Sequence, residues 1–226
     1  MSSASLQGNN GEQGNNGERF LADFLSSAQS DREIFLVGEG DFSFANALSQ
    51  LLCKARRSFS MTATTLDAVA YPVDYLFYRA ESKSASDVPR HIGDLVARGV
   101  VVLQKFDATR DQVPVELTPV GVIIWNFPII EPRISGARSP NKALLQDFLI
   151  NVSDAMDDSS AVMGTLYKSQ STKWDLAAVC KTVGMWVVKT QRFDASEFPD
   201  YNYFYKYPAG HFKHPSAWTY ILKIHT

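Results

Sequence analysis

The stretch that decides the fold is IFLVGEGDFSFANAL, residues Ile34 to Leu48. It begins with four apolar residues, as in a buried strand, and apolar residues recur at helical spacing from Phe44 onward. Gly38 and Gly40 separate the two patterns. A strand, a glycine loop and a helix in this order indicate a ligand loop of an α/β sheet, with free helix amides directed at the ligand. A G-x-G pattern alone fits a structural turn equally well.

Strand and helix patterns alternate along the rest of the chain, which predicts an α/β fold with a seven-stranded sheet. We expect strands at 34–37, 60–66, 100–106, 120–127, 161–167, 185–193 and 217–225, and helices at 44–55, 89–98, 141–156 and 171–184. In the last helix, Ser171 or Thr172 is the expected N-cap and Gly184 the C-cap. Helices separate the early strands, so the sheet is mainly parallel with helices on both faces. No helix separates the last two strands, so we expect one of them to be antiparallel.

Composition and charge limit the class of protein. The chain has 226 residues, of which 45% are hydrophobic, and its net charge is -2. This length fits a single domain at 19–226, and the charge lacks the strongly basic signature of many nucleic-acid binders. Residues 1–18 repeat GNNGE and contain no aromatic residue, so we expect a disordered tail there.

Targeting and metal signals are missing from the sequence pattern. The chain has neither the basic start and apolar core of a secretory signal nor an apolar run long enough to span a membrane. No cysteine or histidine spacing matches a metal site. We therefore expect a soluble intracellular protein without a bound metal.

Polar residues follow three further predicted strands. Asp67 and Asp107 each come directly after a strand, and Asn126-Phe127-Pro128 ends another. Each aspartate alone is more often a cap or turn residue. Together with the glycine loop, they lie at successive strand ends, where α/β sheets bind nucleotides. In that case Asp67 would accept hydrogen bonds from ribose hydroxyls, and Asp107 would reach an adenine amino group.

Five segments resemble one known family. LVGEGDFSFANAL, TTLD, GVVVLQKFDAT, VIIWNFP and FDASEFPDYNY follow one another between Ile34 and Leu222. In sequence and order they resemble the uridine-N3 ribosomal RNA methyltransferases, whose domain has a Rossmann-like class I methyltransferase fold. The resemblance implies S-adenosylmethionine as the methyl donor and a uridine of large-subunit ribosomal RNA as the acceptor. It also implies ribosomal RNA in a pre-ribosomal particle as the partner and a nucleolar or nuclear location, with a cytoplasmic location as the alternative.

The resemblance also assigns roles to individual residues. The donor would contact Gly38, Glu39, Gly40 and Asp41 on its methionine side, supported by Phe42, Ser43 and Phe44, with Asp67 at the ribose and Asp107 and Ala108 at the adenine. Asn126, Phe127 and Pro128 correspond to the Asn-Pro-Pro-aromatic motif with which amino-methylating relatives position the target nitrogen. Asn126 would orient the uracil edge, and Phe127 would stack on the ring. The chain departs from the family at Ile129, where a histidine is expected.

Basic residues near the predicted pocket are candidates for RNA contact, because RNA binding needs basic and aromatic surface. They are Arg133, Arg138, Lys168, Arg192 and Lys206. No histidine lies at a predicted strand end of the pocket, so the base that removes the uridine N3 proton is not identified.

Three functions remain compatible with the sequence. The first is an active RNA methyltransferase. The second is a donor-binding relative that has lost catalysis and serves as a ribosome-assembly or RNA-binding factor, which Ile129 permits. The third is a nicotinamide-dependent oxidoreductase. Ser43 in place of the third fingerprint glycine, and the pairing of Asp67 with Asp107, count against this last function.

Overall fold

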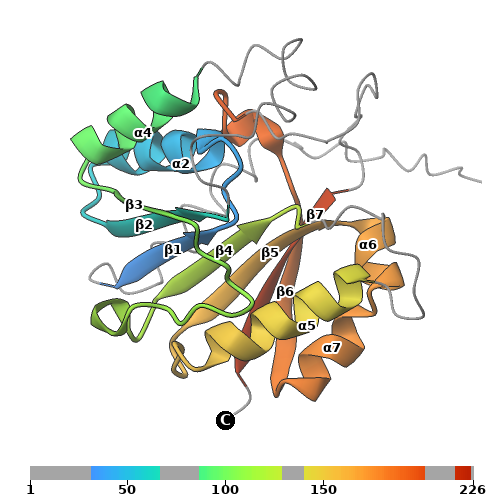
Figure 1. The fold of residues 1–226 in the computed structure, drawn as a ribbon. Helices are drawn as coiled ribbons and strands as arrows, with labels where there is room; N and C mark the ends of the chain where they lie inside the picture. The colour runs from blue at the N-terminus through green and yellow to red at the C-terminus, as the bar shows by residue number, and fades with distance from the viewer. Residues whose placement is uncertain (1–31, 67–86, 129–139, 202–216, 225–226) are drawn as a thin grey trace, which may run out of the picture.

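A seven-stranded mixed sheet forms the centre of the molecule (Figure 1). The structure is a computed structural model that describes residues 32–66, 87–128, 140–201 and 217–224. The strand order is β3-β2-β1-β4-β5-β7-β6, and β7 is antiparallel to both of its neighbours. The strands are β1 (Glu33–Val37), β2 (Ser60–Thr65), β3 (Val101–Gln104), β4 (Val122–Asn126), β5 (Ala161–Tyr167), β6 (Met185–Arg192) and β7 (Ala217–Ile224). The predicted sheet and its antiparallel strand near the end of the chain are confirmed.

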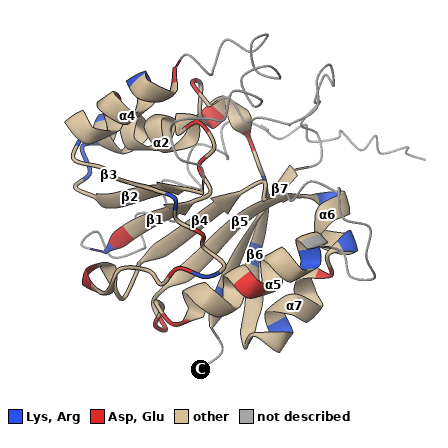
Figure 2. Ribbon diagram, in the orientation of Figure 1, with Lys and Arg blue, Asp and Glu red and all other residues tan. Residues whose placement is uncertain are grey.

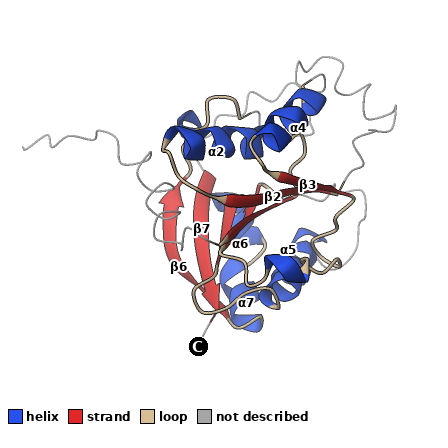
Figure 3. Ribbon diagram, turned by 90° about the vertical axis from the view of Figure 1, so that its left-hand side faces the viewer, coloured by secondary structure: helices blue, strands red, loops and turns tan. Residues whose placement is uncertain are grey.

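Helices cover both faces of the sheet, as Figure 3 shows from the side. One face carries α2 (Ser43–Lys54) and α4 (Val88–Ala97), and the other carries α5 (Pro140–Ser153), α6 (Lys168–Lys173) and α7 (Leu176–Thr182). Short 3-10 turns η1 (Val115–Leu117) and η2 (Ala195–Glu197) lie in connections. Successive side chains of a strand point to opposite faces. In β1, Ile34 and Leu36 therefore join the core under α2, while Phe35 and Val37 join the core under α5.

The predicted site lies between β1 and β4, at the point where the order of the strands in the sheet reverses. β1 pairs with both β2 and β4, and the chain continues outward from each side of it. Sheets of this kind bind ligands beyond the carboxyl ends of their strands at this reversal. The loop after β1 and Asn126 at the end of β4 therefore share one edge of the sheet.

The region predicted as one helix at 171–184 forms two. Trp174 is buried in the core on the α5 face, and Asp175 adopts a left-handed conformation, with φ 53°, that breaks the helix there. The predicted N-caps are wrong, because the Ser171 and Thr172 hydroxyls donate to the Lys168 carbonyl inside α6. Gly184 does follow the end of α7 with positive φ.

Within the described residues, every helix is too short or too polar to cross a lipid bilayer.

Candidate functional site

The loop between β1 and α2 makes a left-handed turn at each end. Gly38 has φ +70°, and a Cβ atom at this position would lie 3.1 Å from Nε1 of Trp125. Phe42 has φ 60° and is buried as the N-cap of α2. The amide of Glu39 donates to the carbonyl of Thr64 at 2.8 Å, which ties the loop to β2. The loop is therefore fixed by backbone geometry on both sides and by β2 in the middle.

Two buried carboxylates occupy the N-terminus of α2. Oδ1 of Asp41 accepts hydrogen bonds from the amide of Ser43 at 3.0 Å and from its hydroxyl at 2.6 Å. Oε2 of Glu39 accepts a hydrogen bond from the amide of Ala45 at 3.0 Å. The expectation that the helix presents free amides is therefore wrong for Ser43 and Ala45. An anionic ligand finds these two donors already satisfied, whereas a cationic group would be favoured beside two acidic side chains.

The surroundings of Glu39 favour its neutral form. Burial raises the pKa of Glu39 to about 8, the hydrogen bond from Ala45 lowers it, and the nearby charge of Asp41 raises it. Desolvation is the largest of these effects because it penalises the charged form of a carboxyl group. The loop therefore contains an acid that is poised to ionise near neutral pH.

Helix α4 supports this loop through His91, which is 2% exposed. Its Nδ1 lies 2.8 Å from the carbonyl oxygen of Asp41, and its Nε2 lies 3.2 Å from Nη2 of Arg90. A guanidinium can only donate, so Nε2 accepts and the Nδ1–H group donates to Asp41. Arg98 of the same segment donates to Oδ1 of Asn46 in α2 at 2.6 Å.

The end of β3 forms a second polar loop beside β2. The amide of Phe106 donates to the carbonyl of Thr65, and Oδ1 of Asp107 accepts from the amide and hydroxyl of Thr109 at 3.0 and 2.7 Å. Oδ2 of Asp107 faces Nε of Arg110 at 3.8 Å. Ala108 is buried, and its carbonyl accepts from Nδ2 of Asn151. Asp107 therefore stabilises the turn after β3 through its own side chain.

A pocket opens at the ends of β4, β5 and β6 and the start of β7. Cross-strand pairing aligns Asn126 with Thr165 and Thr165 with Thr219, whose hydroxyl oxygens lie 3.1 Å apart. Nδ2 of Asn126 is buried and has no hydrogen-bond partner among the described residues. The pocket wall combines amides and hydroxyls with aromatic rings and includes Phe44, Asn126, Thr165, Gln191, Phe193 and Thr219. Such a wall suits a flat ring with polar edges.

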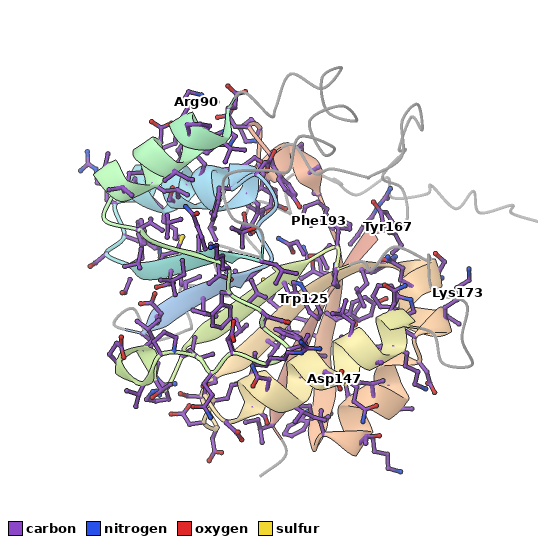
Figure 4. The ribbon with its side chains drawn as sticks, in the orientation of Figure 1. Arg90, Trp125, Asp147, Tyr167, Lys173 and Phe193 are labelled. Atoms are coloured by element: carbon purple, nitrogen blue, oxygen red, sulfur yellow. The ribbon has the colours of Figure 1, made fainter. Side chains whose placement is uncertain are left out.

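The three residues of the predicted catalytic motif point to different surroundings. Asn126 lines the pocket. Phe127 has φ 49° and packs its ring against Tyr167 and Phe193, at centroid distances of 5.2 and 5.5 Å; Figure 4 labels these two partner rings. Pro128 is buried beside Trp125 on the α5 side of the sheet. The ring of Phe127 therefore contacts protein side chains in this structure, and the rings that line the pocket include Phe193.

The structure describes only some of the predicted contact residues. Lys168 is the exposed first residue of α6, and Arg192 is the exposed last residue of β6 and lines the pocket. Figure 2 shows basic residues on α6 and at the adjoining end of α5, where Lys142 pairs with Asp175 at 3.1 Å. The following predicted residues lie outside the described ranges: Asp67, Ile129, Arg133, Arg138 and Lys206.

Comparison with known proteins links the chain to one family. A family model described as BMT5-like, rRNA (uridine-N3-)-methyltransferase, matches residues 35–204. An uncharacterized protein from Arabidopsis thaliana is 26% identical over 181 residues, which cover 76% of this chain and 81% of that protein.

Solved structures share the fold at low sequence identity. The CcbJ methyltransferase from Streptomyces caelestis has a TM-score of 0.54 and 9% identity, and the match covers 92% of this chain and 90% of that chain. The ribosomal protein L11 methylase from Lactobacillus delbrueckii subsp. bulgaricus has a TM-score of 0.51 and 12% identity, and the match covers 91% of this chain and 76% of that chain. The predicted Rossmann-like methyltransferase fold is thereby confirmed.

Proposed function

Because the chain belongs to the BMT5-like family of rRNA (uridine-N3-)-methyltransferases, we propose that it methylates N3 of a uridine in large-subunit ribosomal RNA. An RNA methyltransferase is what the family and the fold support together. Our proposal has four finer parts: the modified atom, the ribosomal subunit, a pre-ribosomal particle as the partner, and a nucleolar location.

The observation that carries the proposal is the acidic closure of α2 by Glu39 and Asp41. S-adenosylmethionine supplies a methyl group on a positively charged sulfur, and a loop with two acidic side chains, one of them able to ionise near neutral pH, suits such a donor. A nicotinamide dinucleotide instead carries a pyrophosphate, which binds to unoccupied amides at a helix N-terminus. Since Ser43 and Ala45 have already donated theirs, the loop favours a methyltransferase over an oxidoreductase.

The donor would lie along the carboxyl edge of the β1, β2 and β3 strands. We assign its methionine end to the loop from Gly38 to Phe44, its ribose to Asp67, and its adenine to Asp107 and Ala108. The ties from Glu39 and Phe106 to β2 support this assignment, because they hold both ends of the proposed site against the strand that lies between β1 and β3.

The uracil would enter the pocket at the end of β4. Its N3–H group lies between two carbonyl groups, and the buried Nδ2 of Asn126 is a donor that lacks an acceptor within the described residues. We propose that Nδ2 donates to one uracil carbonyl and so directs N3 toward the methyl group. The ring of Phe193 would contact the base, and Phe127, packed behind it, would fix the position of Asn126.

RNA outside the pocket would contact basic residues around its rim. Arg192 lines the pocket, and Lys168 follows the end of β5, so both lie near the proposed uracil site. We retain Arg133, Arg138 and Lys206 as proposed contacts. The backbone phosphates would pair with these side chains, which predicts binding that weakens as salt increases.

The test is methyl transfer from labelled S-adenosylmethionine to total RNA from cells that lack the protein. We expect label in large-subunit ribosomal RNA, and 3-methyluridine as the labelled nucleoside after digestion. Label in another nucleoside would contradict the proposed acceptor. Donor binding without any transfer would instead favour the assembly-factor function.

Replacing His91 with phenylalanine is expected to weaken donor binding roughly fivefold, equivalent to about 1 kcal/mol. The change fills the buried space but leaves the Asp41 carbonyl without the hydrogen bond from Nδ1, so the loop loses its tie to α4. Titration calorimetry would measure the affinity. Val96→Ala, at an exposed position of the same helix, should bind the donor like the unmodified protein, and equal affinities for all three would contradict the support role.

A further inference from the structure

The carboxyl group of Glu39 is buried, and none of the cationic side chains that the structure describes pairs with it. The residue is 6% exposed, and no lysine or arginine among the described residues lies within ion-pair distance of it. Its side chain accepts a hydrogen bond from the amide of Ala45. A lone carboxylate in such a place would be costly, so the buried group takes up a proton.

The titratable groups that the structure describes around Glu39 add no compensating positive charge at its carboxyl group. Asp41, in the same loop, adds negative charge. From α4, His91 uses Nδ1 on the Asp41 carbonyl and Nε2 on Arg90, so both of its ring nitrogens are already engaged. In α2 the single charged residue, Lys54, lies at the far end of the helix, and β2 contains no charged residue.

We infer that Glu39 exchanges a proton when the methyl donor binds. The carboxyl group is protonated in the free protein, and it ionises when the positively charged donor enters the loop. The O–H bond of the acid breaks, its electron pair stays on the carboxylate, and the proton passes to the solvent. This inference rests on the proposed donor site, since the cation is the donor itself.

The charge of the donor is the physical cause. An opposite charge within about 4–6 Å lowers the pKa of a carboxyl group by roughly 1–3 units. Starting from a pKa of about 8, such a shift would leave Glu39 ionised in the donor complex at neutral pH. The demethylated product, S-adenosylhomocysteine, keeps the same amino and carboxylate groups but has an uncharged sulfur, so the pKa of Glu39 should fall less in that complex. Glu39 thus becomes the residue that distinguishes donor from product.

The pH dependence follows from linkage. Between the lowered pKa of the complex and the pKa of the free protein, binding releases a proton, so affinity rises with pH. Donor affinity should rise by up to about tenfold per pH unit from pH 6.5 toward 8 and then level off. Affinity for the product should change much less, so preference for the donor over the product increases with pH.

The test is calorimetric titration at pH 7 in phosphate and in Tris, whose different heats of ionisation reveal the number of protons released. For the unmodified protein we expect roughly 0.5–1 more proton released with S-adenosylmethionine than with S-adenosylhomocysteine. Glu39→Gln keeps an acceptor for the Ala45 amide and should abolish this difference. Asp147→Asn makes the same carboxyl-to-amide replacement on the exposed face of α5 and should leave the difference intact (Figure 4).

The outcomes separate the inference from the function on which it rests. Equal proton release with donor and product, or unchanged release in Glu39→Gln, would overturn the proton exchange while leaving the methyltransferase in place. Failure of both ligands to bind the unmodified protein would overturn the donor site and the exchange together. Should Glu39→Gln not fold, the comparison of donor with product in the unmodified protein decides alone.

Discussion

Replacing Gly38 with valine is expected to weaken the binding of S-adenosylmethionine at least tenfold and to lower the melting temperature. The residue has φ +70°, and its missing side chain leaves room for the indole of Trp125, which a Cβ atom would approach to 3.1 Å. A left-handed conformation costs a residue with a side chain roughly 1–2 kcal/mol, and a β-branched side chain fits it worst. The loop would relieve this strain by moving Glu39 and the end of α2, where the donor is proposed to bind.

Gly93→Ala is the matched control for this change. Gly93 lies inside α4, and nothing comes within 4 Å of a Cβ atom placed there. Alanine should therefore stabilise the protein by about 0.5–1 kcal/mol through helix propensity and leave donor affinity unchanged. Thermal denaturation and titration calorimetry would measure both variants. Normal donor affinity in Gly38→Val would show that the turn at Gly38 does not shape the donor site.

The strands themselves, though not their order, were predictable because the central ones, β1, β2, β4 and β5, are largely buried on both faces. The first four residues of β4, VIIW, are apolar without alternation, which separates such strands from the amphipathic helices between them. The division of 171–184 into α6 and α7 was not predictable, because it depends on the burial of Trp174 against distant residues. A continuous helical pattern does not reveal that one aromatic residue in it belongs to the core.

A recurring turn explains part of what the sequence analysis missed at the site. In four Asp-x-Ser/Thr segments, Oδ1 of the aspartate accepts from the amide and the hydroxyl two residues later, at Asp41, Asp107, Asp157 and Asp194. These side chains are known to bond to their own backbone in this way. The spacing was visible in the sequence, so the closure of the α2 N-terminus by Asp41 could have been predicted.

The polar wall of the pocket had no comparable signal. Thr165 and Thr219 are 54 residues apart, and they meet only because β5 and β7 pair in one particular antiparallel register. Single-sequence patterns fix which residues face a sheet surface but not which strands become neighbours. The same holds for His91, which reads as an ordinary residue of α4 until the helix is placed beside the loop.

Replacing Asn126 with alanine is expected to reduce methyl transfer by about a hundredfold or more while donor affinity stays within roughly threefold. The amide would direct the uracil edge, and the donor would contact other strand ends. In the free protein Nδ2 is buried without a partner among the described residues, a situation that costs about 1–3 kcal/mol. Removing it should therefore leave the melting temperature unchanged or raise it, which separates a lost contact with the substrate from a damaged fold.

Asn126→Asp tests which atom of the amide acts. It keeps the size of the side chain and replaces the donor Nδ2 with an acceptor oxygen, so it can no longer donate to a uracil carbonyl. We expect it to be as inactive as Asn126→Ala in single-turnover transfer to ribosomal RNA. Activity retained in Asn126→Asp but lost in Asn126→Ala would assign the role to the carbonyl oxygen Oδ1 instead.

Because Asn126 is aligned with Thr165 on β5, Thr165→Val should cause a smaller loss of transfer, since the wall keeps its shape and loses one hydroxyl.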